Sequence, residues 1–188
     1  MTVKTSRLQD MRIYLSGACE CAPETGADWR KEVTPPLVAL GLTVFDPVHS
    51  DITLPCGISK QEEFIYVKKL REEGNYSELE KIMKEITHMD CRMCDCADIL
   101  LVYLDSTIQT TGTIHEIIIS VMQKKPIYVA CKQGKKHIPL WLFGIIPHTY
   151  MFETLTEAVQ ELTKISKTSD KDLKTLDNKR WLFVNGIK

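Results

Sequence analysis

The stretch from Ala97 to Ser120, ADILLVYLDSTIQTTGTIHEIIIS, decides the fold class of this chain. Residues 99–104 form an uninterrupted apolar run, which is typical of a strand buried on both faces of a sheet. The run ends at Asp105, passes through a polar loop and turns at Gly112 into a helix that begins near Thr113. In an open α/β sheet, ligands bind outside the carboxyl ends of the strands. The stretch therefore predicts a parallel-sheet protein with Glu116 at the mouth of a pocket.

Glu116 has two interpretations. Thr113-x-x-Glu116 matches the capping box, in which the Thr hydroxyl and the Glu carboxylate each accept a hydrogen bond from an unpaired backbone N–H. In that case Glu116 only stabilises the start of its helix. In the other interpretation its carboxylate does chemistry in the pocket. The motif by itself leaves both open.

The rest of the chain alternates between strand and helix patterns. Strands are expected at 11–17, 42–45, 99–104 and 127–130, and helices at 29–40, 62–89 with a break near Gly74, from 113 onward, and 153–165. Within these helices, Pro35 and Pro36 are expected in the first turns, where a missing N–H costs least, and Ile82, Met83 and Ile86 are expected to form a buried stripe. This alternation predicts an α/β fold: an open, mainly parallel sheet with helices on both faces, a Rossmann-like, flavodoxin-like three-layer sandwich.

The composition predicts one soluble domain. The 188 residues carry a net charge of −1 with both signs interspersed, which predicts no nucleic-acid partner. No apolar run approaches the ~20 residues of a membrane span, and the first residues lack a signal-peptide core, so we expect a cytoplasmic protein without a membrane partner. Residues 1–188 are expected to form a single domain, with 1–10 a flexible N-terminus and 166–179 a charged surface segment. Residues 180–184 should dock on the core or on a second subunit.

The seven cysteines indicate a reducing compartment rather than a disulfide framework. His88, Cys91, Cys94 and Cys96 have a metal-like spacing, but four ligands within nine residues would struggle to surround a tetrahedral ion. We therefore predict no metal and no cofactor, and keep a metal-binding module as an alternative. The glycine motifs of dinucleotide-binding and P-loop proteins are absent from the sequence.

Several motifs, taken in order, resemble the nucleoside 2-deoxyribosyltransferase-like family between about residue 11 and residue 165. They are IYLSG in the first strand, DWRKEV opening the first helix, FDPV at the end of the second strand, D-x7-DILLVYLD followed by GTxxE, and KKPIYVA with the apolar stretch ending in HTYMF. The resemblance implies the same fold. It also implies an enzyme that cleaves the N-glycosidic bond of deoxynucleosides or nucleotides and passes the sugar to another base or to water.

The resemblance assigns roles to individual residues. Glu116 matches the nucleophile that forms a glycosyl-enzyme ester, in the manner of a retaining glycosidase. Asp90 matches the carboxylate that protonates or orients the departing base, and Tyr14 matches the phenol that hydrogen-bonds the nucleophile. Gly112 would let the backbone approach the sugar. The remaining substrate-binding candidates are Gly17, Asp46, His49, Asp51, Thr110 and Thr113.

The substrate stays open between a nucleoside and a nucleotide. Thr110 stands where many deoxynucleoside-transferring relatives have an Asp, and relatives that hydrolyse nucleoside 5′-monophosphates have a hydroxyl residue there. Against a nucleotide, residues 16–20 lack the arginine that phosphate-binding relatives use, although Arg30 or a lysine could substitute.

The predicted partners are a nucleoside or nucleotide, a free nucleobase and a second copy of the chain. The family assembles as homodimers or larger homo-oligomers in which a neighbour closes the pocket, and the apolar residues 141–152 suit such a contact. The alternatives to a deoxyribosyltransferase are a nucleoside 5′-monophosphate N-glycosidase and a non-catalytic nucleotide-binding module in which Glu116 only caps its helix.

Overall fold

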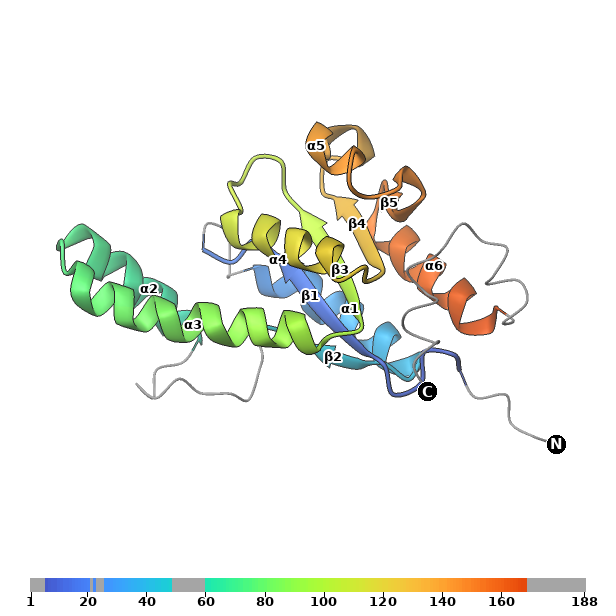
Figure 1. The fold of residues 1–188 in the computed structure, drawn as a ribbon, viewed down its shortest axis with the longest axis horizontal. Helices are drawn as coiled ribbons and strands as arrows, with labels where there is room; N and C mark the ends of the chain where they lie inside the picture. Colours follow the sequence, from blue (N-terminus) through green and yellow to red (C-terminus); the bar gives the residue numbers. More distant parts are fainter. Residues whose placement is uncertain (1–5, 21, 23–25, 49–59, 169–188) are drawn as a thin grey trace.

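Five parallel strands form the central sheet (Figure 1). The computed structural model describes residues 6–20, 22, 26–48 and 60–168. The strands are β1 (Arg12–Gly17), β2 (Thr43–Phe45), β3 (Ile99–Leu104), β4 (Ile127–Cys131) and β5 (Met151–Phe152), in the order β2-β1-β3-β4-β5. This is the flavodoxin-like order, so the predicted fold class is confirmed. The direction in which the strands are added reverses between β1 and β3, and ligands bind at such switch points.

Helices cover both faces of the sheet. On one face, α1 (Ala27–Ala39) and α6 (Leu155–Lys167) pack against Ile13 and Leu15 of β1. On the other face, α3 (Tyr76–Cys96), α4 (Thr111–Met122) and the short α5 (Leu140–Phe143) share a core with Tyr14. Helix α2 (Lys60–Glu72) packs on α3, and this α2–α3 hairpin projects beyond the sheet (Figure 1). Among the described residues, no helix is long and apolar enough to cross a membrane.

The α2–α3 hairpin turns where the sequence predicts a break. Gly74 has φ +71°, and the side chain of Asn75 caps α3 by accepting a hydrogen bond from the Glu78 N–H at 3.4 Å. Ile82 belongs to the expected buried stripe, but Met83 is 37% exposed, so that part of the prediction is wrong. The Met83 side chain faces a cavity instead of the α2–α3 contact.

The tandem prolines lie deeper in α1 than predicted. The helix begins at Ala27, so Pro35 and Pro36 fall in its third turn rather than its first. Each proline removes one helical N–H donor. Both are exposed, as are Lys31 and Glu32, whose carbonyls lose these donors, so that water can replace the missing bonds. The helix ends as predicted, with Gly41 at φ +87°.

The beginning of the described chain is packed rather than free. Leu8 is fully buried in the core cluster, and the Arg7 side chain donates to the Thr168 carbonyl at 3.1 Å. The prediction of a flexible N-terminus is therefore wrong for residues 6–10. Residues 166 and 167 belong to the last turn of α6 and Thr168 is its C-cap, while 169–188, with most of the predicted charged segment and the apolar 180–184, lie outside the described residues.

The apolar segment 141–152 divides between core and surface. Leu142 and Met151 are buried on the α4 side of the sheet, whereas Trp141 and Phe143 are exposed. Contact with a second copy of the chain stays a prediction.

The burial of Leu8 can be tested by mutation. We expect Leu8→Ala to lower the free energy of unfolding by about 2–5 kcal/mol, because it leaves a cavity between β1, α1 and α6. The control is Met122→Ala, whose side chain is 77% exposed and which should change stability by less than about 0.5 kcal/mol. Urea unfolding measures both. Equal, small effects would contradict the packing of this segment.

Candidate active site

A cavity of about 460 Å³ opens at the carboxyl ends of β1 and β3, at the switch point of the sheet. Residues from the end of β1 and its following loop, from the α2–α3 hairpin, and from the loop and first turns of α4 line this cavity. Tyr14, Asp90 and Glu116 are all among the lining residues. The three predicted catalytic side chains therefore meet in one cavity, although they come from three separate elements.

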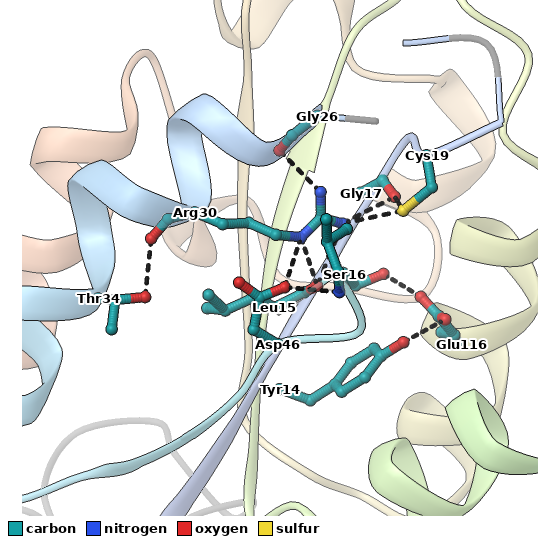
Figure 2. Close-up of polar contacts among 11 residues, drawn as sticks. Tyr14, Leu15, Ser16, Gly17, Cys19, Gly26, Arg30, Thr34, Asp46 and Glu116 are labelled. Carbon is teal, nitrogen blue, oxygen red and sulfur yellow. Dashed lines mark hydrogen bonds and ion pairs between the residues drawn. The ribbon is translucent and has the colours of Figure 1, made fainter. Parts of the chain in front are cut away.

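The carboxylate of Glu116 is held by two hydroxyl groups of β1. Tyr14 donates a hydrogen bond to Oε1 at 2.8 Å, and Ser16 donates one to Oε2 (Figure 2). Side chains two residues apart on a strand point to the same face, so Tyr14 and Ser16 both face α4. Glu116 lies in the second turn of α4 and is buried against this face.

Helix α4 does not use Glu116 as a cap. The helix begins at Thr111, and its N-cap residue Thr110 makes no side-chain capping hydrogen bond. Thr113 is therefore inside the helix, and both oxygens of Glu116 are bonded to β1. The capping interpretation of Glu116 is wrong.

The capping motif does operate elsewhere in the chain. At Thr154-x-x-Glu157, the Thr154 hydroxyl accepts from the Glu157 N–H at 3.2 Å, and the Glu157 carboxylate accepts from the Glu153 N–H at 3.0 Å. This side-chain capping fixes the start of α6.

The environment of Glu116 shifts its acidity towards neutral pH. Burial raises the pKa of Glu116 to about 7, while the hydrogen bonds from Ser16 and Tyr14 oppose that rise. The charge of Asp90 also raises the pKa of Glu116, and the charge of Arg30 lowers it. Burial, together with the charge of Glu116, raises the pKa of Tyr14 well above its usual value, so Tyr14 is a neutral donor. A carboxylate with these properties can act as a nucleophile or a base near pH 7.

Asp90 lies inside α3 rather than at a helix end or in a loop. Its helix packs against α4, so two adjacent helices present Asp90 and Glu116 to the same cavity. A pair of carboxylates in one cavity is the group that acid–base or glycosyl-transfer chemistry requires.

Four of the predicted substrate-binding residues also line the cavity: Gly17, Thr110, Gly112 and Thr113. At Gly17, a Cβ would lie 2.8 Å from the Tyr103 carbonyl oxygen and 3.0 Å from the Trp29 ring, so its close packing requires glycine. At Gly112, a Cβ would meet nothing within 4 Å, so this glycine borders open space.

Asp46 does not line the cavity. Its carboxylate accepts from the Val48 N–H at 2.8 Å and pairs with Arg30 at 3.5 Å, which gives it a structural role after β2. His49 and Asp51 lie outside the described residues.

Arg30, one of the residues left open as a substitute for the missing phosphate-binding arginine, is fully buried and so is not available for that role. Its guanidinium donates to the carbonyls of Gly26 at 2.8 Å, Gly17 at 3.1 Å and Leu15 at 3.4 Å (Figure 2). Arg30 therefore fixes the loop between β1 and α1, which forms one wall of the cavity.

Among the site residues that the sequence analysis missed, two groups stand out. Ser16 is one, and its two-residue spacing from Tyr14 was the signal that could have found it. The other is the set that the α2–α3 hairpin contributes to the cavity wall: Phe64, Arg71, Met83, Ile86, Thr87 and Cys91. Their position depends on how the hairpin packs, for which the sequence carries no local signal.

The cysteines near the C-terminal end of α3 contribute in part to packing of the core. Cys94 is buried and lies 3.5 Å from the Ser120 hydroxyl and 3.8 Å from the Glu116 carbonyl oxygen. Within the described ranges, no three His, Cys, Asp or Glu side chains come together as a group that could hold a metal ion.

Comparison with known proteins shows a likeness of fold. No family model and no curated protein matches the chain. The structure is similar to that of a 2-deoxyribosyltransferase from the psychrotolerant bacterium Bacillus psychrosaccharolyticus, with a TM-score of 0.52 at 18% identity, over 86% of this chain and 95% of that one. A conserved protein from Enterococcus faecalis V583 matches with a TM-score of 0.44 at 17% identity, over 87% and 94% of the two chains. The first of these likenesses shows that this chain has the α/β three-layer fold of that 2-deoxyribosyltransferase.

The burial of Glu116 predicts a specific pH dependence of stability. Its pKa is about 7 in the folded protein and 4.5 ordinarily, so the folded state binds more protons between these values and loses stability as pH rises through that window. Glu116→Gln removes this loss. We expect the unfolding free energy of Glu116→Gln, relative to that of wild type, to increase by a few kcal/mol as pH rises from 4.5 to about 7.

Chemical unfolding at a series of pH values measures this difference. Ser120→Ala removes a buried, non-titrating hydroxyl from the same helix, so it should differ from wild type by the same amount at every pH. A Glu116→Gln curve parallel to wild type would show that the carboxylate is not buried as described.

Proposed function

We propose that this protein cleaves the N-glycosidic bond of 2-deoxyribonucleosides and transfers the deoxyribosyl group to another nucleobase, or to water, through a covalent ester with Glu116. The observation that carries this proposal is the buried Glu116 carboxylate, which β1 holds at the wall of a cavity shared with Asp90. The motifs that resemble the 2-deoxyribosyltransferase-like family, and the shared fold with a 2-deoxyribosyltransferase, support it.

The reaction follows from two displacements at the anomeric carbon. A carboxylate oxygen of Glu116 attacks C1′, the C1′–N bond breaks, and its electron pair leaves with the base, to which Asp90 delivers a proton. The nitrogen of a second base, or a water molecule, then attacks C1′ while its proton passes to the Asp90 carboxylate, and the C1′–O bond breaks with its electron pair returning to Glu116. Two inversions retain the configuration of the sugar, as in retaining glycosidases.

The cavity offers different surfaces to the base and to the sugar. Apolar side chains of the α2–α3 hairpin, Phe64, Met83 and Ile86, line it together with Asp90. A flat nucleobase suits this apolar wall, with its nitrogen near Asp90. The sugar then lies towards the first two turns of α4, which carry Thr113 and Glu116.

The charges of the cavity favour a nucleoside over a nucleotide. Glu20, Asp90 and Glu116 bring carboxylates to its lining, and they would repel a phosphate. Arg71 also lines the cavity, but its guanidinium pairs with Glu20 at 2.9 Å.

A specific observation favours a second candidate, a nucleoside 5′-monophosphate N-glycosidase. The N-cap residue Thr110 makes no side-chain capping hydrogen bond to α4, and Thr110, Thr111 and Gly112 from this end line the cavity. Backbone N–H groups at a helix N-terminus bind phosphate well. Both candidates use Glu116 and Asp90 in the same way.

The role of Glu116 can be separated from a structural role by a matched pair of variants. We expect Glu116→Ala to lower the exchange of base between deoxyinosine and adenine roughly a thousandfold or more, because it removes the nucleophile. Glu157→Ala removes a glutamate that caps α6, so it should cost about 1 kcal/mol of stability and leave exchange intact. Chromatography of deoxyadenosine and hypoxanthine measures the exchange. Full activity in Glu116→Ala would contradict the proposal.

The substrate class can be tested with a panel of deoxynucleosides and their 5′-monophosphates. We expect a higher kcat/KM for the deoxynucleosides, since the carboxylates of the cavity repel a phosphate. A preference for the monophosphates, with free base released and no exchange, would select the second candidate. No turnover of any member would contradict both.

A further inference from the structure

We propose that Ser16 is a positioning residue: its hydroxyl anchors Oε2 of Glu116 against β1 and leaves Oε1 as the oxygen that attacks the sugar. This inference rests on the proposed function and deepens it, because it divides the two carboxylate oxygens between a structural and a chemical role.

The two hydroxyl groups that donate to Glu116 differ in whether they line the cavity. Both donors are fully buried, but Tyr14 lines the cavity together with Glu116, whereas Ser16 does not. Figure 2 shows the two hydrogen bonds reaching different oxygens of the carboxylate. The oxygen held by Ser16 is therefore turned to the buried strand, and the oxygen held by Tyr14 is on the side of the cavity.

In the proposed reaction the two carboxylate oxygens of Glu116 take different roles. When Oε1 bonds to C1′ and the base leaves with the C1′–N electron pair, the carboxylate loses its charge and Oε2 becomes the carbonyl oxygen of the ester. A hydrogen bond from Tyr14 to Oε1 weakens, because that oxygen is now an ester oxygen without charge. The Ser16 hydroxyl can donate to Oε2 in the carboxylate and in the ester alike. Ser16 thus keeps the carboxyl group oriented through both displacements.

The charges around Glu116 make the Ser16 hydrogen bond important for the ionisation of the carboxylate. The ionisable groups that interact with it come from several elements: Tyr14 of β1, Cys19 of the following loop, Arg30 of α1, and Asp90, Cys91 and Cys94 of α3, with His115 beside it on α4. Burial and Asp90 disfavour the ionised carboxylate, whereas Ser16, Tyr14 and Arg30 favour it. Loss of the Ser16 hydroxyl removes one of the groups that favour the ionised carboxylate, without changing the residues that line the cavity.

The test compares Ser16→Ala with Ser120→Ala. Both remove a fully buried hydroxyl near Glu116, but that of Ser120 contacts Cys94 and not the carboxylate. We expect Ser16→Ala to lower kcat about tenfold or more near pH 7 with KM unchanged, and to move the acidic limb of the pH–rate profile to higher pH. Ser120→Ala should match wild type in kcat and in the profile. A Ser16→Ala profile that overlays that of Ser120→Ala, or an effect on KM alone, would overturn the proposal.

Two further measurements separate this inference from the proposed function. In protein with ¹³C-labelled glutamate carboxyls, Ser16→Ala should raise the titration midpoint of Glu116, and Ser120→Ala should not; this readout needs no activity. If wild type turns over no substrate while the midpoint moves, the proposed function fails and the anchoring by Ser16 stands. An unmoved midpoint overturns the anchoring, whether or not the protein is active.

The assignment of the attacking oxygen has its own readout. In a crystal structure of the glycosyl ester trapped with a 2′-fluoro nucleoside, the ester carbonyl oxygen should lie within hydrogen-bond distance of Ser16. A carbonyl oxygen next to Tyr14, with the sugar bonded on the Ser16 side, would overturn it.

Discussion

Burying the carboxylate of Glu116 between α4 and β1 is the interaction on which the site depends. An ionised group loses its hydration when a helix covers it, and hydrogen bonds must offset that loss. The hydroxyls of Tyr14 and Ser16 offset part of it, and the pKa of about 7 reflects the part that remains. A complete salt bridge would hold the carboxylate ionised at a lower pKa and make it less nucleophilic. The contact that joins α4 to the central strand therefore also leaves the carboxylate reactive.

A buried cation balances this anion from the other face of β1. Arg30 belongs to α1, which packs on the opposite side of the sheet from α4, and it bonds to the backbone of β1 at Leu15 and Gly17. Its charge lowers the pKa of Glu116 across the strand. The end of β1 is thus held by backbone bonds from one side and by side-chain bonds from the other (Figure 2). This explains why Arg30, although close to the cavity, is unavailable to a ligand.

Local patterns predicted the elements but not the state of Glu116. The apolar run 99–104 and the turn at Gly41 are local features, and the structure confirms both. The start of α4 does not depend on local sequence alone, because the loop before it is bonded to the residues after β4. The Asp105 carboxylate accepts hydrogen bonds from the Thr107 N–H at 3.0 Å and from the Gln133 amide at 2.7 Å. With this tertiary contact in place, α4 begins at Thr111, whereas the capping motif predicts a start after Thr113. The Glu116 carboxylate is then not used as a helix cap and bonds to β1 instead. Resemblance to a family, rather than periodicity, pointed to the chemical role of Glu116.

The placement of Asp90 inside a helix has a consequence for how the two carboxylates work together. The end of α3 is fixed by Lys125, whose ammonium group donates to the carbonyls of Cys94 and Asp95 at 2.7 Å each, and Lys125 itself lies in the turn after α4. Packed helices hold functional groups in place better than loops do. Both carboxylates are therefore carried on packed helices, so binding energy is not needed to bring their helices together. For the proposed nucleoside substrate, what remains is its own alignment, with the base against the α2–α3 hairpin and the anomeric carbon facing Glu116.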